Sequence, residues 1–232
     1  MYDSRALLAS STRTAERVSA FLTKVYGWMC IGLGITAAVA YLVASSPALT
    51  SALMANRLVF FALVLAELGL VFFLSARVQS LEPGTAAGLF VAYAALNGVT
   101  LSLILLIYTG ASIATTFIVT GAMFGALAVY GTTTSRSLAG AGQFFVMGLI
   151  GLVLASIVGM FWHNDALQFL ITIVGVIVFT GLTAWDAQRL KQMALTLPDG
   201  QAGAYAVVGA LSLYLNFVNL FLMLLRLQGR RD

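Results

Sequence analysis

Apolar residues follow one another in long uninterrupted runs along this chain. A membrane-spanning helix needs roughly 20 mostly apolar residues to cross about 30 Å of hydrocarbon. Strands of a membrane barrel would instead show about ten residues of apolar–polar alternation. The pattern therefore predicts an all-α polytopic membrane protein with seven spanning helices, at residues 25–44, 58–76, 86–108, 111–130, 144–162, 166–185 and 204–225.

Polar and turn-forming residues separate these runs. Ser45-Ser46-Pro47 and Glu82-Pro83-Gly84 are two such breaks, and the break at Thr109-Gly110 is so short that it predicts a tight helical hairpin. Residues 1–24 are polar and basic, without the short apolar segment and cleavage site of a signal peptide. We therefore expect an N-terminal arm at 1–24 and one seven-helix transmembrane domain at 25–232.

Composition narrows the function classes. Of the 232 residues, 61% are hydrophobic and only 9% are charged, too few charges to cover the surface of a soluble enzyme. The net charge of +4 comes from 12 basic and 8 acidic residues without a basic patch, so we expect no nucleic-acid partner. The single cysteine, Cys30, and the single histidine, His163, exclude an internal disulfide and a multi-histidine metal site.

Catalytic motifs are also missing from the sequence. One loop histidine cannot serve a Ser–His–Asp set, and no phosphate-binding loop or second intramembrane aspartate is present. We therefore expect a protein that is not an enzyme and that has no cofactor.

Basic residues indicate the orientation. Short cytoplasmic loops are enriched in Lys and Arg. With the N-terminus in the cytoplasm, that side holds eight basic residues and the other holds four: Arg57, Arg226, Arg230 and Arg231. The C-terminal basic residues disagree with the rule if all seven helices cross. We expect a cytoplasmic N-terminus and seven crossings.

Two acidic residues lie in or against the predicted spans. A charged group in hydrocarbon costs at least about 2.5–3.5 kcal/mol near the centre, so it suggests a functional site. Glu67 lies midway along the second span and is either a neutral acid satisfied by neighbours or an acid on an ion pathway. Asp186 ends the sixth span and is either an interfacial acid beside Arg189 or part of a site. Arg77, alone, would be an ordinary interfacial anchor.

Two segments resemble a known family. The sixth span ends in Thr183-Ala184-Trp185-Asp186, and the seventh contains Leu213-Tyr214-Leu215-Asn216-Phe217-Val218-Asn219-Leu220-Phe221. These are similar to the motifs of the Bax inhibitor-1 family, which has a Thr-Ala-Tyr-Asp-like end to helix six and a Leu-Tyr-Leu-Asp-Phe-x-Asn-Leu-Phe run in helix seven. The resemblance implies a seven-helix bundle with the C-terminal helix in the middle.

The resemblance also implies function. Family members are described as pH-sensitive calcium leak channels and as modulators of cell death or of membrane-protein quality control. Two aspartates on helices six and seven form a proton-sharing dyad, latched by an arginine at the end of helix two, and an acid within helix two lies on the pathway. By position, Asp186 is the first dyad member, Glu67 the pathway acid and Arg77 the candidate latch, while Arg189 could also stabilise an ionised Asp186. Asp186 and Glu67 would then be transient calcium ligands.

This sequence departs from the pattern at the second dyad position, which is Asn216. An Asp–Asn pair lacks the repulsion by which two carboxylates hold a shared proton. We therefore expect calcium conduction with altered pH sensitivity. The alternative is a non-conducting protein that binds a membrane protease or another membrane protein and modulates a stress or cell-death response. Either protein would reside in the lipid bilayer of a bacterial inner membrane.

Overall fold

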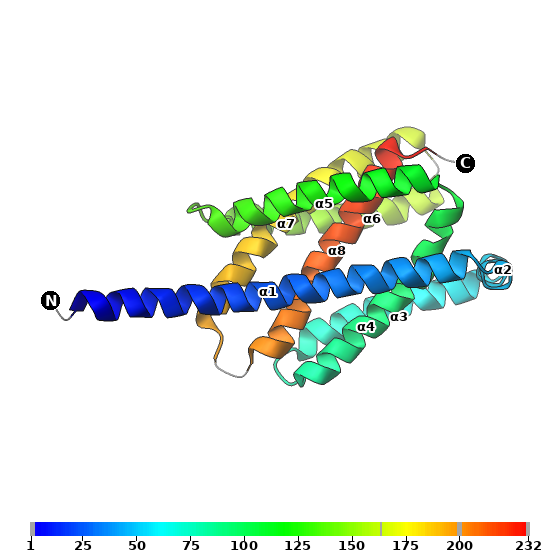
Figure 1. Cartoon of the computed structure of the whole chain (residues 1–232). Helices are drawn as coiled ribbons and strands as arrows, with labels where there is room; N and C mark the ends of the chain where they lie inside the picture. Colours follow the sequence, from blue (N-terminus) through cyan, green and yellow to red (C-terminus); the bar gives the residue numbers. More distant parts are fainter. Residues whose placement is uncertain (1–2, 163, 199–200, 231–232) are drawn as a thin grey trace. The chain divides into compact units, whose positions relative to one another are not determined.

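The computed structural model describes residues 3–162, 164–198 and 201–230, and His163 and Arg231 lie outside them. The described residues form helices joined by short connections. The elements are α1 (Asp3–Ala44), α2 (Pro47–Ala55), α3 (Arg57–Arg77), α4 (Pro83–Leu101), the 3-10 helix η1 (Ser102–Leu106), α5 (Gly110–Thr133), α6 (Ala139–Phe161), α7 (Asp165–Thr196) and α8 (Ala202–Gln228). The all-α prediction is confirmed (Figure 1).

Seven of these helices are long and apolar enough to cross a membrane, as predicted. Their bounds differ from the prediction mainly at two places. Helix α1 is continuous from Asp3 to Ala44, so no break in secondary structure separates the predicted arm at 1–24 from the first span. Helix α7 does not end near Asp186 but continues to Thr196, because polar residues such as Gln188 and Gln192 are compatible with a helix that leaves the apolar region.

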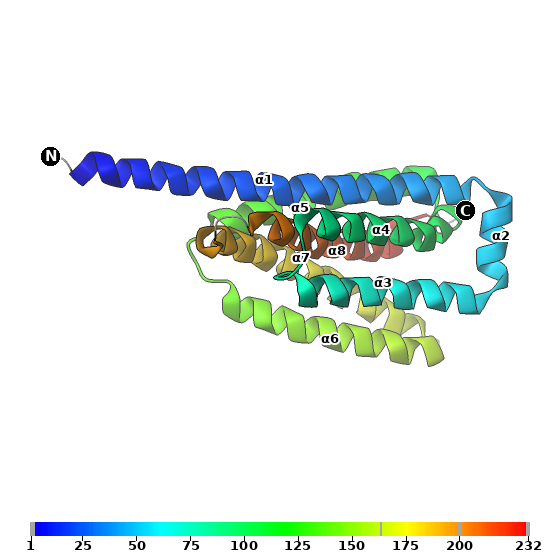
Figure 2. The ribbon, with the colours of Figure 1, turned by 90° about the horizontal axis from the view of Figure 1, so that it is seen from below.

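The chain divides into two compact units. Unit 1 comprises residues 1–101 and 189–211, and unit 2 comprises 102–188 and 212–232, so α7 and α8 each contribute to both. In unit 1, α4 packs against α1 and α3, and the short α2 connects α1 with α3 (Figure 2). The backbone of α4 comes close to α1 at Gly98, where an added Cβ would lie 2.8 Å from the Thr36 carbonyl oxygen. The Thr36 hydroxyl donates to the Ala94 carbonyl at 2.8 Å and ties the same two helices together.

Unit 2 is built on α5, α6, the first part of α7 and the last part of α8. Phe217 of α8 makes edge-to-face contacts with Phe117 and Phe124 of α5, with ring centroids 5.3 and 5.5 Å apart. Buried aliphatic and aromatic side chains of α6, α7 and α8 form the core of this unit, including Leu152, Phe179 and Leu220.

Helix α8 is the most buried of the seven spans. Of its most apolar window, 61% is buried, compared with 39% for α7 and 6% for α3. This agrees with the prediction that the C-terminal helix is central. A largely buried helix has little lipid-facing surface, so polar side chains on it can be directed at its neighbours.

Candidate functional site: a buried acid–amide pair

The segment of α7 that carries Asp186 is held on several sides within unit 2. Gly131 of α5 brings that helix directly against Ala184 and Ala187, because a Cβ at residue 131 would overlap the Ala184 carbonyl. Gly142 of α6 packs in the same way on the indole ring of Trp185. Small residues at these two places allow the helix backbones to approach closely.

The next side chain along α7, Gln188, fixes the loop before α6. Its Oε1 accepts from the Leu138 backbone N–H at 2.8 Å, and its Nε2 donates to the Arg136 carbonyl at 2.8 Å. Both ends of a buried amide are therefore satisfied, as burial of such a group requires. Together with Gly131 and Gly142, this side chain sets the rotation of α7 and hence the direction of Asp186.

Asp186 meets Asn216 of α8. The Asn216 Nδ2 donates to Asp186 Oδ2 at 2.7 Å, and both side chains are only 6% exposed. Asp186 is therefore enclosed by protein and bonded to an amide of the next helix, while both predicted readings of its role stay predictions. The pair joins the sixth and seventh spans, at the two motif positions where the family resemblance places a dyad.

An amide in this position changes the chemistry of the pair. Two adjacent carboxylates repel one another and share a proton, which makes such a pair titrate in two coupled steps. An amide N–H carries no charge and does not titrate. It donates a hydrogen bond to the ionised aspartate and stabilises it, but the amide cannot share a proton with the carboxylate as a second carboxyl group would. The pair can therefore hold one negative charge at most.

The second predicted acid, Glu67, belongs to unit 1 and forms a separate cluster there. Its Oε1 accepts from the Thr100 hydroxyl at 2.9 Å, and its Oε2 accepts from Asn97 Nδ2 at 3.3 Å. Both donors lie on α4, whereas Glu67 lies on α3. Glu67 is half-buried, so its carboxylate has access to the surroundings as well as to these donors.

The two arginines with predicted roles differ in the exposure of their side chains. Arg77 ends α3 with an exposed side chain, and Arg189 of α7 is half-buried; the latch role of both stays a prediction.

Within the described part of the chain, no three His, Cys, Asp or Glu residues come close enough to hold a metal ion. The sequence argument missed Thr100, Gln188, Gly131 and Gly142. A Thr three residues after Asn97 was the one available signal, because positions i and i+3 share a helix face.

The fold and the pair define an integral membrane protein with a helical bundle and a buried acid–amide contact between its last two helices. Comparison with known proteins agrees. Residues 18–232 match the family described as inhibitor of apoptosis-promoting Bax1. The inner membrane protein YbhL of Escherichia coli is 49% identical over 214 residues, which cover 91% of this chain and 92% of YbhL.

More distant relatives cover the chain as completely. A protein of Borreliella burgdorferi is 44% identical over 213 residues (91% of this chain and 92% of that protein), and a membrane protein of Streptococcus pyogenes is 35% identical over 224 residues (95% and 97%). The chain belongs to the Bax inhibitor-1 family. Like YbhL, it is an integral inner membrane protein.

Proposed function

We propose that this protein is a passive leak channel for calcium, or for cations more generally, and that it has no catalytic activity. Support comes from the family and from the two intramembrane acids. A carboxylate in a membrane is costly unless it is paired, protonated or close to water. Asp186 has a hydrogen-bond donor within a buried contact, whereas Glu67 remains half-buried on a helix that is otherwise little covered.

The cluster around Glu67 has the chemistry of a transient cation ligand. Glu67, Asn97 and Thr100 bring together a carboxylate, an amide and a hydroxyl, which contain the oxygen atoms that calcium prefers. Calcium takes 6–8 such ligands in a stable site. Three protein ligands would bind calcium more weakly, with water completing the coordination. Weak binding is compatible with conduction, because the ion must be able to leave.

The observation that carries the pH part of the proposal is the Asn216–Asp186 hydrogen bond. Without a second carboxylate the pair has no shared proton, so we propose that the leak depends less on pH than it would with two aspartates. Asn216→Asp would create the two-carboxylate pair in the same helix positions.

The experiment is calcium flux into liposomes that contain a calcium dye. We expect the wild type to leak with little change between about pH 6 and 8, and Asn216→Asp to acquire a steep change in that range. Asn219→Asp is the matched control, because it adds one carboxyl group to the same helix at a side chain that, among the described residues, donates to the Leu215 carbonyl of its own helix.

Two results would contradict the proposal. Folded protein whose liposomes stay calcium-tight at every pH would exclude the leak. A steep pH dependence in the wild type that disappears in Asp186→Ala and is insensitive to substitution of Asn216 would exclude the weakened pair.

The other proposal is a protein that binds and modulates a membrane protease. Its support is α1, which continues as a helix through the polar N-terminal arm and exposes Arg13 and Glu16. The test is cross-linking from Glu16→Cys, in a Cys30→Ala background, in native membranes. A protease specifically captured there, and lost when Arg13 and Arg17 are replaced, would favour this function; absence of any specific product would count against it.

A further inference from the structure

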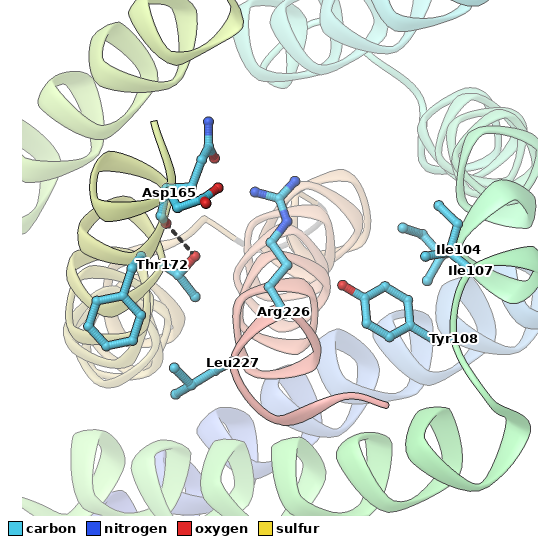
Figure 3. A pocket seen from close by; sticks show the side chains of 9 residues that line it. Ile104, Ile107, Tyr108, Asp165, Thr172, Arg226 and Leu227 are labelled. Carbon is cyan, nitrogen blue, oxygen red and sulfur yellow. Dashed lines mark hydrogen bonds between the residues drawn. The ribbon is translucent and has the colours of Figure 1, made fainter. Parts of the chain in front are cut away.

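Unit 2 contains a pocket of about 610 Å³ that the proposed ion leak does not use (Figure 3). It is lined by the last turn of η1 and the residues after it, by the first turns of α7 and by the end of α8. If each long helix crosses the membrane once, these three chain segments reach the same membrane surface, the one opposite the N-terminus. The volume is typical of a small-molecule site.

Two opposite charges face one another across the pocket. The guanidinium of Arg226, on α8, points toward the carboxylate of Asp165, on α7 (Figure 3). Neither side chain forms a hydrogen bond or an ion pair with another residue of the described chain. An exposed pair gains little free energy by closing on itself, so both charges are available to a molecule that lies between them.

The sign pattern selects the ligand. An anion held by Arg226 would be repelled by Asp165, and a cation held by Asp165 would be repelled by Arg226. A zwitterion satisfies both groups, because phosphate forms charge-assisted hydrogen bonds with a guanidinium and a primary ammonium does so with a carboxylate. We propose that this pocket binds a phosphoethanolamine group, with the phosphate on Arg226 and the ammonium on Asp165.

The remaining lining fits a headgroup at a membrane surface. The buried hydroxyls of Tyr108 and Thr172 lie on the pocket wall, whereas Ile107 and Phe169 are exposed apolar residues at its margin. Such a margin can accept the glycerol and the first acyl carbons of a lipid. The occupant is therefore expected to be a phospholipid such as phosphatidylethanolamine; a soluble molecule with the same headgroup is the other source of this chemistry.

The wall that carries Arg226 is held in place. The chain after α8 is tied to the start of α5, since the Thr109 N–H donates to the Arg230 carbonyl at 3.1 Å and the Arg230 N–H donates to the Ser112 hydroxyl at 2.9 Å. Gly229 lies directly on the ring of Tyr108, where a Cβ would approach to 2.7 Å. These contacts fix the end of α8 relative to the other pocket wall within unit 2.

The test is lipid retention by the purified full chain, measured by native mass spectrometry. Phosphatidylethanolamine and phosphatidylglycerol with the same acyl chains share the phosphate, but only the first has an ammonium group. We expect the wild type to retain phosphatidylethanolamine about tenfold better, which is the factor that one charge-assisted hydrogen bond supplies. Asp165→Asn should remove this preference, Asp165→Glu should keep it, and Arg226→Gln should weaken retention of both lipids.

Controls separate the site from general charge and folding effects. Arg136→Gln removes the same charge from an exposed side chain at the opposite membrane surface and should change nothing. Lipid-free melting temperatures identify variants that fail to fold. Soluble glycerophosphoethanolamine that displaces the lipid at equal concentration would support a soluble source, and failure to displace it would support the lipid.

Equal retention of the two lipids by the wild type and by folded Asp165→Asn and Arg226→Gln would overturn the site. This outcome is independent of calcium flux, so the leak and the headgroup site can fail separately.

Discussion

Each unit contains an acidic side chain in largely apolar surroundings, and the two units stabilise that side chain differently. In unit 2, Asp186 is 6% exposed and accepts a 2.7 Å hydrogen bond from Asn216. In unit 1, Glu67 is half-buried and accepts from Asn97 and Thr100 at 3.3 and 2.9 Å. Both use an amide from a neighbouring helix, yet only the first excludes its surroundings almost completely.

The difference lies in the helices that carry the acids. Glycine contacts from α5 and α6 hold α7 in place around Asp186. By contrast, only 6% of the most apolar window of α3, the helix of Glu67, is buried. A close-packed interior leaves a buried pair little room to change partners, whereas a less covered acid is open to other ligands. This comparison fits a charge-holding role for the Asp186 pair and the proposed ion-contacting role of Glu67.

The largest expected effect comes from breaking the packing around Asp186. Gly131→Ala places a Cβ against the Ala184 carbonyl, a backbone atom that cannot move aside independently. We expect the free energy of unfolding to fall by about 1–3 kcal/mol, the usual cost of overpacking. Unfolding in mixed detergent micelles, followed by circular dichroism, measures the loss.

Gly121→Ala is the control for that substitution. It lies on the same helix with no atom within 4 Å of an added Cβ, and removing a helical glycine favours the helix by up to about 1 kcal/mol. If both alanine variants are equally stable, the close approach of α5 to α7 does not hold the Asp186 segment.

The second effect compares the two amides. Asn216→Ala leaves a buried carboxylate without its amide donor and should destabilise the fold by about 1–2 kcal/mol, the upper range for polar contacts between membrane helices. Asn97→Ala removes the longer of the two side-chain hydrogen bonds to the half-buried Glu67 and should cost about 0.6 kcal/mol, the average for such contacts. The same unfolding assay measures both, and equal losses would refute the distinction between the sites.

The sequence was enough to predict the seven spans, because their apolar runs are long and carry few charges. It also singled out Glu67, Asp186 and Asn216, since polar groups in a membrane are rare. It could not predict the packing glycines. Gly121 and Gly125 have the four-residue spacing that permits close helix contact, yet no atom lies within 4 Å of an added Cβ at either position; Gly131 and Gly142 make the close approaches.

The reason is geometric. Which face of a helix meets a neighbour depends on the rotation and tilt of both helices, and a helix that is apolar all round gives no periodic signal of its inner side. Asn219 illustrates the same limit: its amide donates to the Leu215 carbonyl of its own helix at 2.8 Å, whereas the amide of Asn216 on the same helix reaches Asp186 on α7. The sequence did not single out Asp165 and Arg226 as pocket residues for a different reason: charged residues at helix ends are usually ordinary interfacial anchors.

The smallest expected effect tests whether water reaches the carboxylate of Glu67. Thr100→Val keeps the shape of the side chain and removes the hydroxyl that donates to Glu67 Oε1 at 2.9 Å. Because Glu67 is half-buried, water can replace this donor, so we expect a change in unfolding free energy below about 0.6 kcal/mol. Thr100→Ser retains the hydroxyl and should match the wild type. If Thr100→Val lowers the free energy of unfolding as much as Asn216→Ala does, Glu67 is as inaccessible to water as Asp186. That result would contradict the proposed role of Glu67 as the acid that contacts passing cations.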